Sequence, residues 1–299
     1  MKVKQKKSAL LPGLITALMV VAAVAGGLRM TDPDGGRLDT IRQELETITA
    51  ENEGLTAQVE ALRTETAEQK ALPEAIQKQK DEGFRLLGEL ERQIRAGESD
   101  KRIAYLTFDD GPYDNTTDAI LDILKEKGVH ATFFLRHRPD HVAQIQREIR
   151  EGHTLANHSY SHKIKAVYQS ADSCIKEIRD QQKWLTETVG VTPEIYRFPG
   201  GSPTAGNKKQ AIAAALAADG LGYVDWNCAT GDGLPGVLTT EKAYQNAVSS
   251  VGEQKIVVML MHDYSAATLE ALPDIIDTLK AKGYMMMPLF RESVMIRSA

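Results

Sequence analysis

Short apolar runs alternate strictly with amphipathic stretches of helical period from Arg102 onward, and this alternation constrains the fold more than any other feature. Several of the helical stretches end at a glycine, as α-helices commonly do. Strict alternation of strand and helix predicts a parallel sheet, either closed into a barrel or open and doubly wound. Seven strands suit a barrel slightly short of the usual eight. The predicted strands cover residues 103–108, 131–135, 153–157, 194–198, 222–226, 256–261 and 284–289, and the predicted helices cover residues 116–127, 140–151, 171–189, 207–219, 240–251 and 266–282.

Polar side chains that could carry chemistry follow most of the predicted strands. They are Asp109 and Asp110 after the first strand, His158 and His162 after the third, Arg197 at the end of the fourth, Asp225 at the end of the fifth and His262 after the sixth. Any one of them alone would more often be a turn, cap or strand-end residue without a catalytic role. Active sites of parallel α/β folds lie at the carboxyl ends of the strands, so their joint occurrence on that face predicts an active site.

The residue types at this face match one kind of reaction. Two histidines and one carboxylate are a familiar ligand set for a catalytic zinc ion that keeps a further position open for water. Such an ion lowers the pKa of water and polarises a carbonyl group, while a second carboxylate can act as general base and a further histidine as general acid. The set therefore predicts metal-assisted hydrolysis of an amide or ester with one divalent ion, Zn²⁺ or an ion such as Co²⁺ or Ni²⁺.

Composition excludes several other classes of protein. The chain has 36 basic and 41 acidic residues and a formal charge of −5, which provides no basic face for nucleic acid. Cys174 and Cys228 are its only cysteines, so a disulfide framework and a cysteine zinc site are excluded, and spacing leaves open whether the two pair. No glycine-rich phosphate-binding loop occurs in the sequence.

The N-terminal segment predicts export. Lysines crowd residues 1–8, an apolar run follows at 9–28, and acidic residues come after it. The run is long enough to span a bilayer, and its basic flank places residues 1–8 in the cytoplasm and the remainder outside. We therefore expect a single-pass transmembrane signal anchor in the cell membrane. The alternative is a secreted protein, with a signal peptide cleaved after the Ala-Val-Ala sequence that ends at Ala25.

Residues 37–96 predict a helical stalk. Their first part has a heptad pattern, with Asn52 at a core position and apolar residues at Leu38, Ile41, Leu45, Ile48, Leu55, Val59 and Leu62. We expect Pro73 to interrupt the helix, a second amphipathic stretch to follow, and residues 97–100 to form a linker. A parallel coiled-coil homodimer is one interpretation. The alternatives are that the two helices fold back on each other or lie against the C-terminal domain.

Four segments of the C-terminal domain resemble the motifs of a known family. They are TFDDGP at 107–112, HSYSH at 158–162, RFPGG at 197–201 and LMH at 260–262. In this order and spacing they resemble the NodB-type polysaccharide deacetylases, carbohydrate esterase family 4, over residues 101–290. The resemblance implies a deformed (β/α) barrel with about seven parallel strands, here preceded by the transmembrane helix and the coiled-coil stalk. It also implies a metal-dependent hydrolase that removes acetyl groups.

The resemblance implies a role for each matching residue. The metal ligands would be Asp110, His158 and His162. Asp109 would be the general base, Arg197 its ion-pair partner, and His262 the general acid that protonates the leaving amine. The substrate would contact Pro199, Gly200, Trp226 and Leu260, of which Leu260 belongs to the pocket for the acetyl methyl group.

Two positions depart from the family pattern. An aromatic residue often follows the proline of the third motif, whereas Gly200 stands there, so that side of the site is more open while a backbone N–H remains for the oxyanion. The aspartate that orients the catalytic histidine corresponds to Asp232 if Trp226 matches the earlier tryptophan of the fourth motif. Gly233 then replaces the second tryptophan. Asp225, beside Trp226, is the alternative, and we favour Asp232.

The predicted substrate follows from the activity and the location together. A deacetylase domain outside the membrane would meet peptidoglycan as the nearest abundant polymer, so we expect it to act on the N-acetylglucosamine units of that polymer. Chitin oligomers, exopolysaccharide and acetylxylan are alternatives, because specificity lies in loops that the sequence does not define. A catalytically inactive glycan-binding or scaffold module on the stalk is an alternative of a different class, and the complete set of catalytic residue types argues against it.

Overall fold

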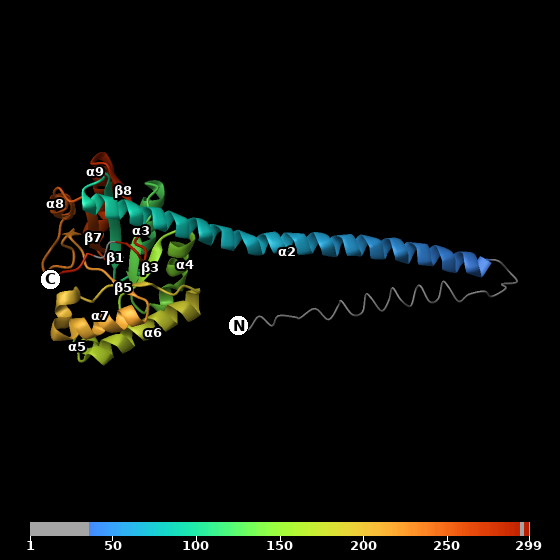
Figure 1. The fold of residues 1–299 in the computed structure, drawn as a ribbon, viewed down its shortest axis with the longest axis horizontal. Coiled ribbons are helices and arrows are strands. Elements are labelled where there is room, and N and C mark those ends of the chain that lie inside the picture. Colours follow the sequence, from blue (N-terminus) through green and yellow to red (C-terminus); the bar gives the residue numbers. More distant parts are fainter. Residues whose placement is uncertain (1–35, 294–295, 299) are drawn as a thin grey trace. The chain divides into compact units, whose positions relative to one another are not determined.

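The computed structural model describes residues 36–293 and 296–298, which belong to two compact units with a boundary between Gln79 and Lys80 (Figure 1). No helix in this part of the chain is long and apolar enough to cross a bilayer. The predicted basic tail at 1–8 and the predicted signal anchor at 9–28 lie outside the described residues, so both stay predictions.

One helix, α2 (Gly36–Ala96), runs through the whole predicted stalk. The predicted interruption at Pro73 is wrong, and the helix does not fold back on itself. A proline removes one backbone hydrogen bond, and the bonds on either side of it can keep a long helix continuous. Three predicted heptad residues, Ile48, Leu55 and Val59, keep 45, 50 and 41% of their surface exposed in the single chain. The homodimer stays a prediction.

Parallel strands form one curled sheet at the centre of the second unit (Figure 1). They are β1 (Arg102–Asp109), β2 (Thr132–Leu135), β3 (Thr154–Asn157), β4 (Ile195–Tyr196), β5 (Gly222–Tyr223), β6 (Cys228–Ala229), β7 (Ile256–His262) and β8 (Tyr284–Met286). The order β5-β4-β3-β2-β1-β7-β6 leaves the sheet open between β5 and β6, so it forms an incomplete barrel. All the predicted strands are present. The additional strand β6 is too short for an apolar alternation to reveal it.

Three strands converge on β1. Its pairing with β7 runs from Ile103 to Asp109, while its other edge pairs with β8 at residues 102–104 and with β2 at residues 107–109. In this register Asp109 lies opposite His262 of β7. Two predicted catalytic residues, far apart in the sequence, therefore end neighbouring strands at the same edge of the sheet.

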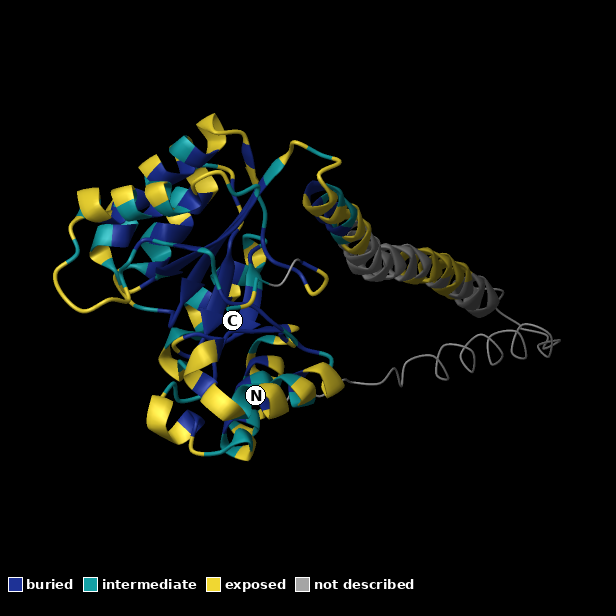
Figure 2. Ribbon diagram, turned by 60° about the vertical axis from the view of Figure 1, so that its left-hand side comes forward, coloured by how far each residue is buried: buried dark blue, intermediate teal, exposed yellow. Residues whose placement is uncertain are grey.

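Helices connect the strands and cover the outer face of the sheet (Figure 2). They are α3 (Thr117–Glu126), α4 (Val142–Arg150), α5 (Ile164–Val167), α6 (Ala171–Val189), α7 (Lys209–Ala218), α8 (Thr240–Val251) and α9 (Ala266–Ala281), with the 3₁₀ helices η1 (Pro139–His141) and η2 (Ser202–Lys208). Hydroxyl groups cap three of them, because Ser170, Thr239 and Ser265 each accept a hydrogen bond from an N–H in the first turn. The predicted helices are confirmed, and α5 is an additional short turn.

The residues of β1 divide the interior into two cores. Ala104, Leu106 and Phe108 pack outward against the helices, whereas Ile103 and Tyr105 point to the concave side of the sheet. This is the alternation expected of a strand that is buried on both faces. Cys174 and Cys228 are both buried and free, and burial raises the pKa of each thiol to about 11, which leaves them unreactive.

The last turns of α2 pack on the concave side of the sheet. The second compact unit begins at Lys80, before residue 101 where the sequence predicts the domain to start. Leu87 and Ile94 are buried in the same core as Ile103, and the ring of Phe84 stacks on Phe290 with 5.0 Å between centroids. The second amphipathic stretch thus lies against the C-terminal domain, which was one of the alternatives that the sequence left open.

Neighbouring leucines of α2 test this packing. Both leucines belong to α2, but Leu87 is buried, with 6% of its surface exposed, whereas Leu86 is 54% exposed. We expect Leu87→Ala to lower the free energy of unfolding by about 2–4 kcal/mol, and Leu86→Ala to change it by less than about 0.5 kcal/mol. Denaturant titration measures both. Equal effects of the two substitutions would contradict the packing.

Candidate active site

The turn after β1 brings two adjacent carboxylates into one site. Neighbouring residues of a strand normally point to opposite faces, but Asp110 leaves the strand with a φ of 78°. Nε2 of His158 consequently lies 3.6 Å from Oδ2 of Asp109 and 4.0 Å from Oδ1 of Asp110. The next residue, Gly111, packs so tightly on Asp263 that a Cβ would lie 1.8 Å from its Oδ2 atom. Only glycine fits this turn.

The predicted metal ligands lie together. One potential ligand atom from each of Asp110, His158 and His162 falls within 4.8 Å of the others, and Nε2 of His162 is 3.4 Å from Oδ1 of Asp110. Nδ1 of His158 is hydrogen-bonded to the carbonyl of Arg197 at 2.9 Å, which leaves its Nε2 lone pair directed at the cluster. The buried Oδ1 of Asp110 accepts no hydrogen bond from any residue that the structure describes. These three residues fit a divalent metal ion.

The surroundings of Asp110 and His162 favour the protonation states in which these side chains can bind a metal. Burial opposes ionisation of Asp110, but the imidazoles of His158 and His162 and the guanidinium of Arg136 outweigh it and lower the pKa of that carboxyl. Burial, reinforced by His158, lowers the pKa of His162 to about 4. An ionised carboxylate and a neutral imidazole are the forms that bind a metal.

Arg197 forms a buried ion pair with Asp109. The guanidinium is fully buried, and its Nη1 donates to Oδ1 of Asp109 at 2.8 Å and to the hydroxyl of Thr107 at 2.7 Å. The guanidinium also stacks on the ring of Phe134, 4.0 Å from its centroid. The ion pair keeps one oxygen of Asp109 occupied and leaves Oδ2 facing the cluster.

His262 is oriented by Asp232. Oδ1 of Asp232 lies 2.7 Å from Nδ1 of His262, and Oδ2 accepts the backbone N–H of His262 at 2.8 Å. Burial lowers the pKa of His262, but the hydrogen bond that Nδ1 of His262 donates to Asp232 and the charge of Asp109 outweigh it and raise the pKa above its ordinary value. Asp225 instead accepts hydrogen bonds from Ser202 and Ser298. Of the two candidate aspartates, Asp232 makes the contact.

The predicted substrate-contact residues lie in different environments. Leu260 is buried on β7, two residues before His262. Trp226 packs against Gly201, where a Cβ would lie 3.0 Å from the indole ring. The carbonyl of Pro199 accepts the hydroxyl of Tyr168 at 2.9 Å. Gly200 is exposed with a φ of 73°.

Three supporting residues were not singled out from the sequence. Thr268 donates its hydroxyl to Oδ2 of Asp232 at 2.6 Å, and Thr107 accepts from Arg197. Asp263 is buried beneath the turn after β1 and accepts from the hydroxyl of Thr117 at 2.7 Å. Thr107 belongs to the TFDDGP motif and Asp263 directly follows His262, so motif context could have indicated both. Nothing in the sequence indicates Thr268.

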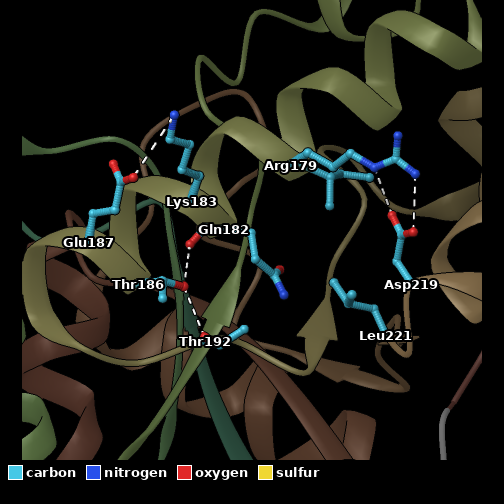
Figure 3. A pocket seen from close by; sticks show the side chains of 9 residues that line it. Arg179, Gln182, Lys183, Thr186, Glu187, Thr192, Asp219 and Leu221 are labelled. Carbon is cyan, nitrogen blue, oxygen red and sulfur yellow. Dashed lines mark hydrogen bonds and ion pairs between the residues drawn. The ribbon is translucent and has the colours of Figure 1, made fainter.

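A surface hollow of about 570 Å³ lies along α6 (Figure 3). Its charged groups are paired with each other: Arg179 with Asp219 at 2.8 Å and Lys183 with Glu187 at 3.9 Å. None of the predicted site residues lines it. The residues able to do chemistry therefore gather at the strand ends and not in this hollow.

Comparison with known proteins identifies the family of this chain. The sequence profile of the family described as polysaccharide deacetylase matches residues 96–221. A peptidoglycan-N-acetylglucosamine deacetylase of Bacillus cereus is 30% identical over 203 residues, which cover 65% of this chain and 71% of that protein.

Solved structures give the same result. The crystal structure of the catalytic domain of a peptidoglycan N-acetylglucosamine deacetylase from Eubacterium rectale matches with a TM-score of 0.63 and 35% identity, over 66% of this chain and 93% of that one. A Streptococcus mutans CE4 esterase matches with a TM-score of 0.61 and 32% identity, over 68% of this chain and 91% of that one. The chain therefore belongs to the polysaccharide deacetylase family, carbohydrate esterase family 4, and is a deacetylase hydrolase.

Proposed function

We propose that this chain hydrolyses the N-acetyl groups of N-acetylglucosamine units in peptidoglycan, using one divalent metal ion. The observation that carries the proposal is the joint placement of the Asp110, His158 and His162 cluster, Asp109 and the His262–Asp232 pair at one edge of the sheet. The names of the Bacillus cereus and Eubacterium rectale relatives support the sugar and the polymer.

Each residue of the site has a separate role in the proposed reaction. Asp110, His158 and His162 would hold the ion, and an ion held there would polarise the acetyl carbonyl and acidify water. Oδ2 of Asp109, which Arg197 leaves free, takes a proton from the attacking water. The backbone N–H of Gly200, which donates to none of the described residues, stabilises the oxygen that gains charge. Nε2 of His262 then gives a proton to the leaving nitrogen, since Asp232 occupies Nδ1.

The proposal includes a location outside the cell. The apolar run at 9–28 behind a basic flank supports a single-pass anchor with the catalytic domain on the outer side, and a cleaved signal peptide would export the same domain. Protease protection of the catalytic domain in intact cells would contradict both forms of export.

The proposal also includes a homodimer through α2. The half-exposed row of Ile48, Leu55 and Val59 at heptad spacing supports pairing with a second copy. Light scattering that gives the mass of one chain at micromolar concentration would contradict it.

Removal of the carboxylate charge at Asp109 tests the general base. We expect Asp109→Asn to lower turnover by at least about 100-fold, because the amide cannot take a proton, while the bound metal stays near the wild-type amount. Acetate release and metal analysis measure the two effects. Asp114→Asn, which changes an exposed carboxylate on the following loop, serves as the control and should keep full activity. An active Asp109→Asn protein would overturn the role.

Metal removal tests the cofactor and the substrate together. We expect a chelator to abolish acetate release from peptidoglycan, and added Zn²⁺, Co²⁺ or Ni²⁺ to restore it to different extents. His162→Ala should weaken metal affinity more than about tenfold, whereas His130→Ala, at an exposed position, should not. Chitin oligomers and acetylxylan in the same assay rank the alternative substrates. Full activity without metal would refute the cofactor, and bound glycan without acetate release would favour the inactive module.

The pH profile tests the pair of His262 and Asp232. The general acid must be protonated, and a raised pKa keeps His262 protonated to higher pH. Asp232→Asn removes the charge that raises this pKa, so we expect the alkaline limb of kcat to move to lower pH. Asp225→Asn is the matched control, because that carboxylate contacts Ser202 and not His262, and it should leave the limb in place. The reverse result would make Asp225 the orienting residue.

A further inference from the structure

Two tyrosine rings border the site beside His262. The ring of Tyr264 lies 5.0 Å from the imidazole of His262 between centroids, with 32° between the planes. The ring of Tyr113 meets Tyr264 edge-on, at 5.7 Å and 75°. Tyr113 follows the turn after β1 and Tyr264 follows β7, so both rings stand at the edge of the sheet that carries the catalytic residues.

The backbone segments that carry the two rings are linked to each other beneath them. The backbone N–H of Tyr113 donates to the hydroxyl of Thr117 at 2.7 Å, and that hydroxyl donates to the buried carboxylate of Asp263. Asp263 directly precedes Tyr264 in the chain. The guanidinium of Arg138 lies over the ring of Tyr113, 4.3 Å from its centroid. The two rings therefore form a surface that exists before any ligand arrives.

The position of Tyr264 has no explanation in core packing. Its side chain keeps 41% of its surface exposed, and its hydroxyl is hydrogen-bonded to none of the residues that the structure describes. A large aromatic ring that stays partly exposed beside a proposed catalytic histidine is typical of a binding surface. Gly200 and Gly233, by contrast, offer no side chain on other sides of the site. Aromatic contact with a ligand is thus available at the tyrosine pair.

We propose that Tyr264, supported by Tyr113, is the stacking surface for a sugar unit of the polysaccharide next to the unit that loses its acetyl group. This inference rests on the proposed deacetylase function. A pyranose ring presents C–H groups on its faces and hydroxyls at its edges, so a half-exposed tyrosine can pack on the face and leave the hydroxyls in water.

The orientation of His262 assigns the surface to a neighbouring unit. Asp232 occupies Nδ1, so Nε2 is the nitrogen that faces the reacting amide. The ring of Tyr264 is tilted by 32° from the imidazole plane and flanks the imidazole, with 5.0 Å between the centroids. A sugar on Tyr264 therefore lies to the side of the reacting unit along the chain, and the reacting acetamide lies elsewhere. Short substrates that lack this neighbour would not use the surface.

Oligosaccharides of increasing length test the proposal. We expect Tyr264→Ala in the full chain to raise KM for a pentasaccharide of N-acetylglucosamine by about five- to tenfold, and to leave KM for the monosaccharide and kcat for both near wild type. Tyr264→Phe should behave like wild type, since it keeps the ring. Val237→Ala, at a 98% exposed apolar position, is the control and should change neither constant.

Two results would overturn the proposal. One is an unchanged KM for the pentasaccharide in Tyr264→Ala. The other is a loss of kcat at every substrate length with a shifted alkaline limb, which would make Tyr264 a support for His262 and not a sugar surface. Pentasaccharide affinity measured by calorimetry in the Asp109→Asn background, with and without Tyr264→Ala, gives the same comparison without turnover. A wild-type chain that releases no acetate would refute the proposed function, whereas equal affinities in this background would refute only the sugar surface.

Discussion

Arg197 is completely buried, so its guanidinium must find partners inside the protein, because an uncompensated buried charge strongly destabilises a fold. It finds them at the ends of two other strands, β1 and β5. Its donors reach the carboxylate of Asp109, the hydroxyl of Thr107 and the carbonyls of Val224 and Asp225. The residue follows β4, the carbonyls follow β5, and the carboxylate ends β1. One side chain thus joins strands that are not neighbours in the sheet.

This contact acts where the barrel is incomplete. Strands β4 and β5 are two residues long, and the sheet stays open beyond β5, so backbone pairing alone holds that edge weakly. Arg197 crosses the concave side from this edge to β1, and its removal would leave Asp109 as a buried unpaired charge, which destabilises by about 3–5 kcal/mol. The carboxylate of Asp109 and the weak edge therefore depend on the same ion pair.

The sequence predicts the face that carries the site, because apolar runs define the strands and parallel strands end at one edge. It could not choose between Asp225 and Asp232 on physical grounds, since both lie near Trp226. The choice depends on tertiary contacts: Asp225 is bound by Ser298 from the far end of the chain, and Asp232 by Thr268 of α9. The continuous helix at Pro73 likewise follows from neighbouring backbone bonds that residue type alone does not report.

Three consecutive residues at the end of β7 have three different environments. His262 pairs with Asp232, Asp263 turns inward beneath the turn after β1, and Tyr264 stays partly exposed to solvent. Burial raises the pKa of Asp263 to about 7, so this carboxyl can hold Thr117 without placing a full charge beside Asp110. The tight approach of Gly111 to Asp263 then fixes the turn that carries Asp110. A side chain at position 111 would have to displace Asp263, and with it its chain neighbours His262 and Tyr264.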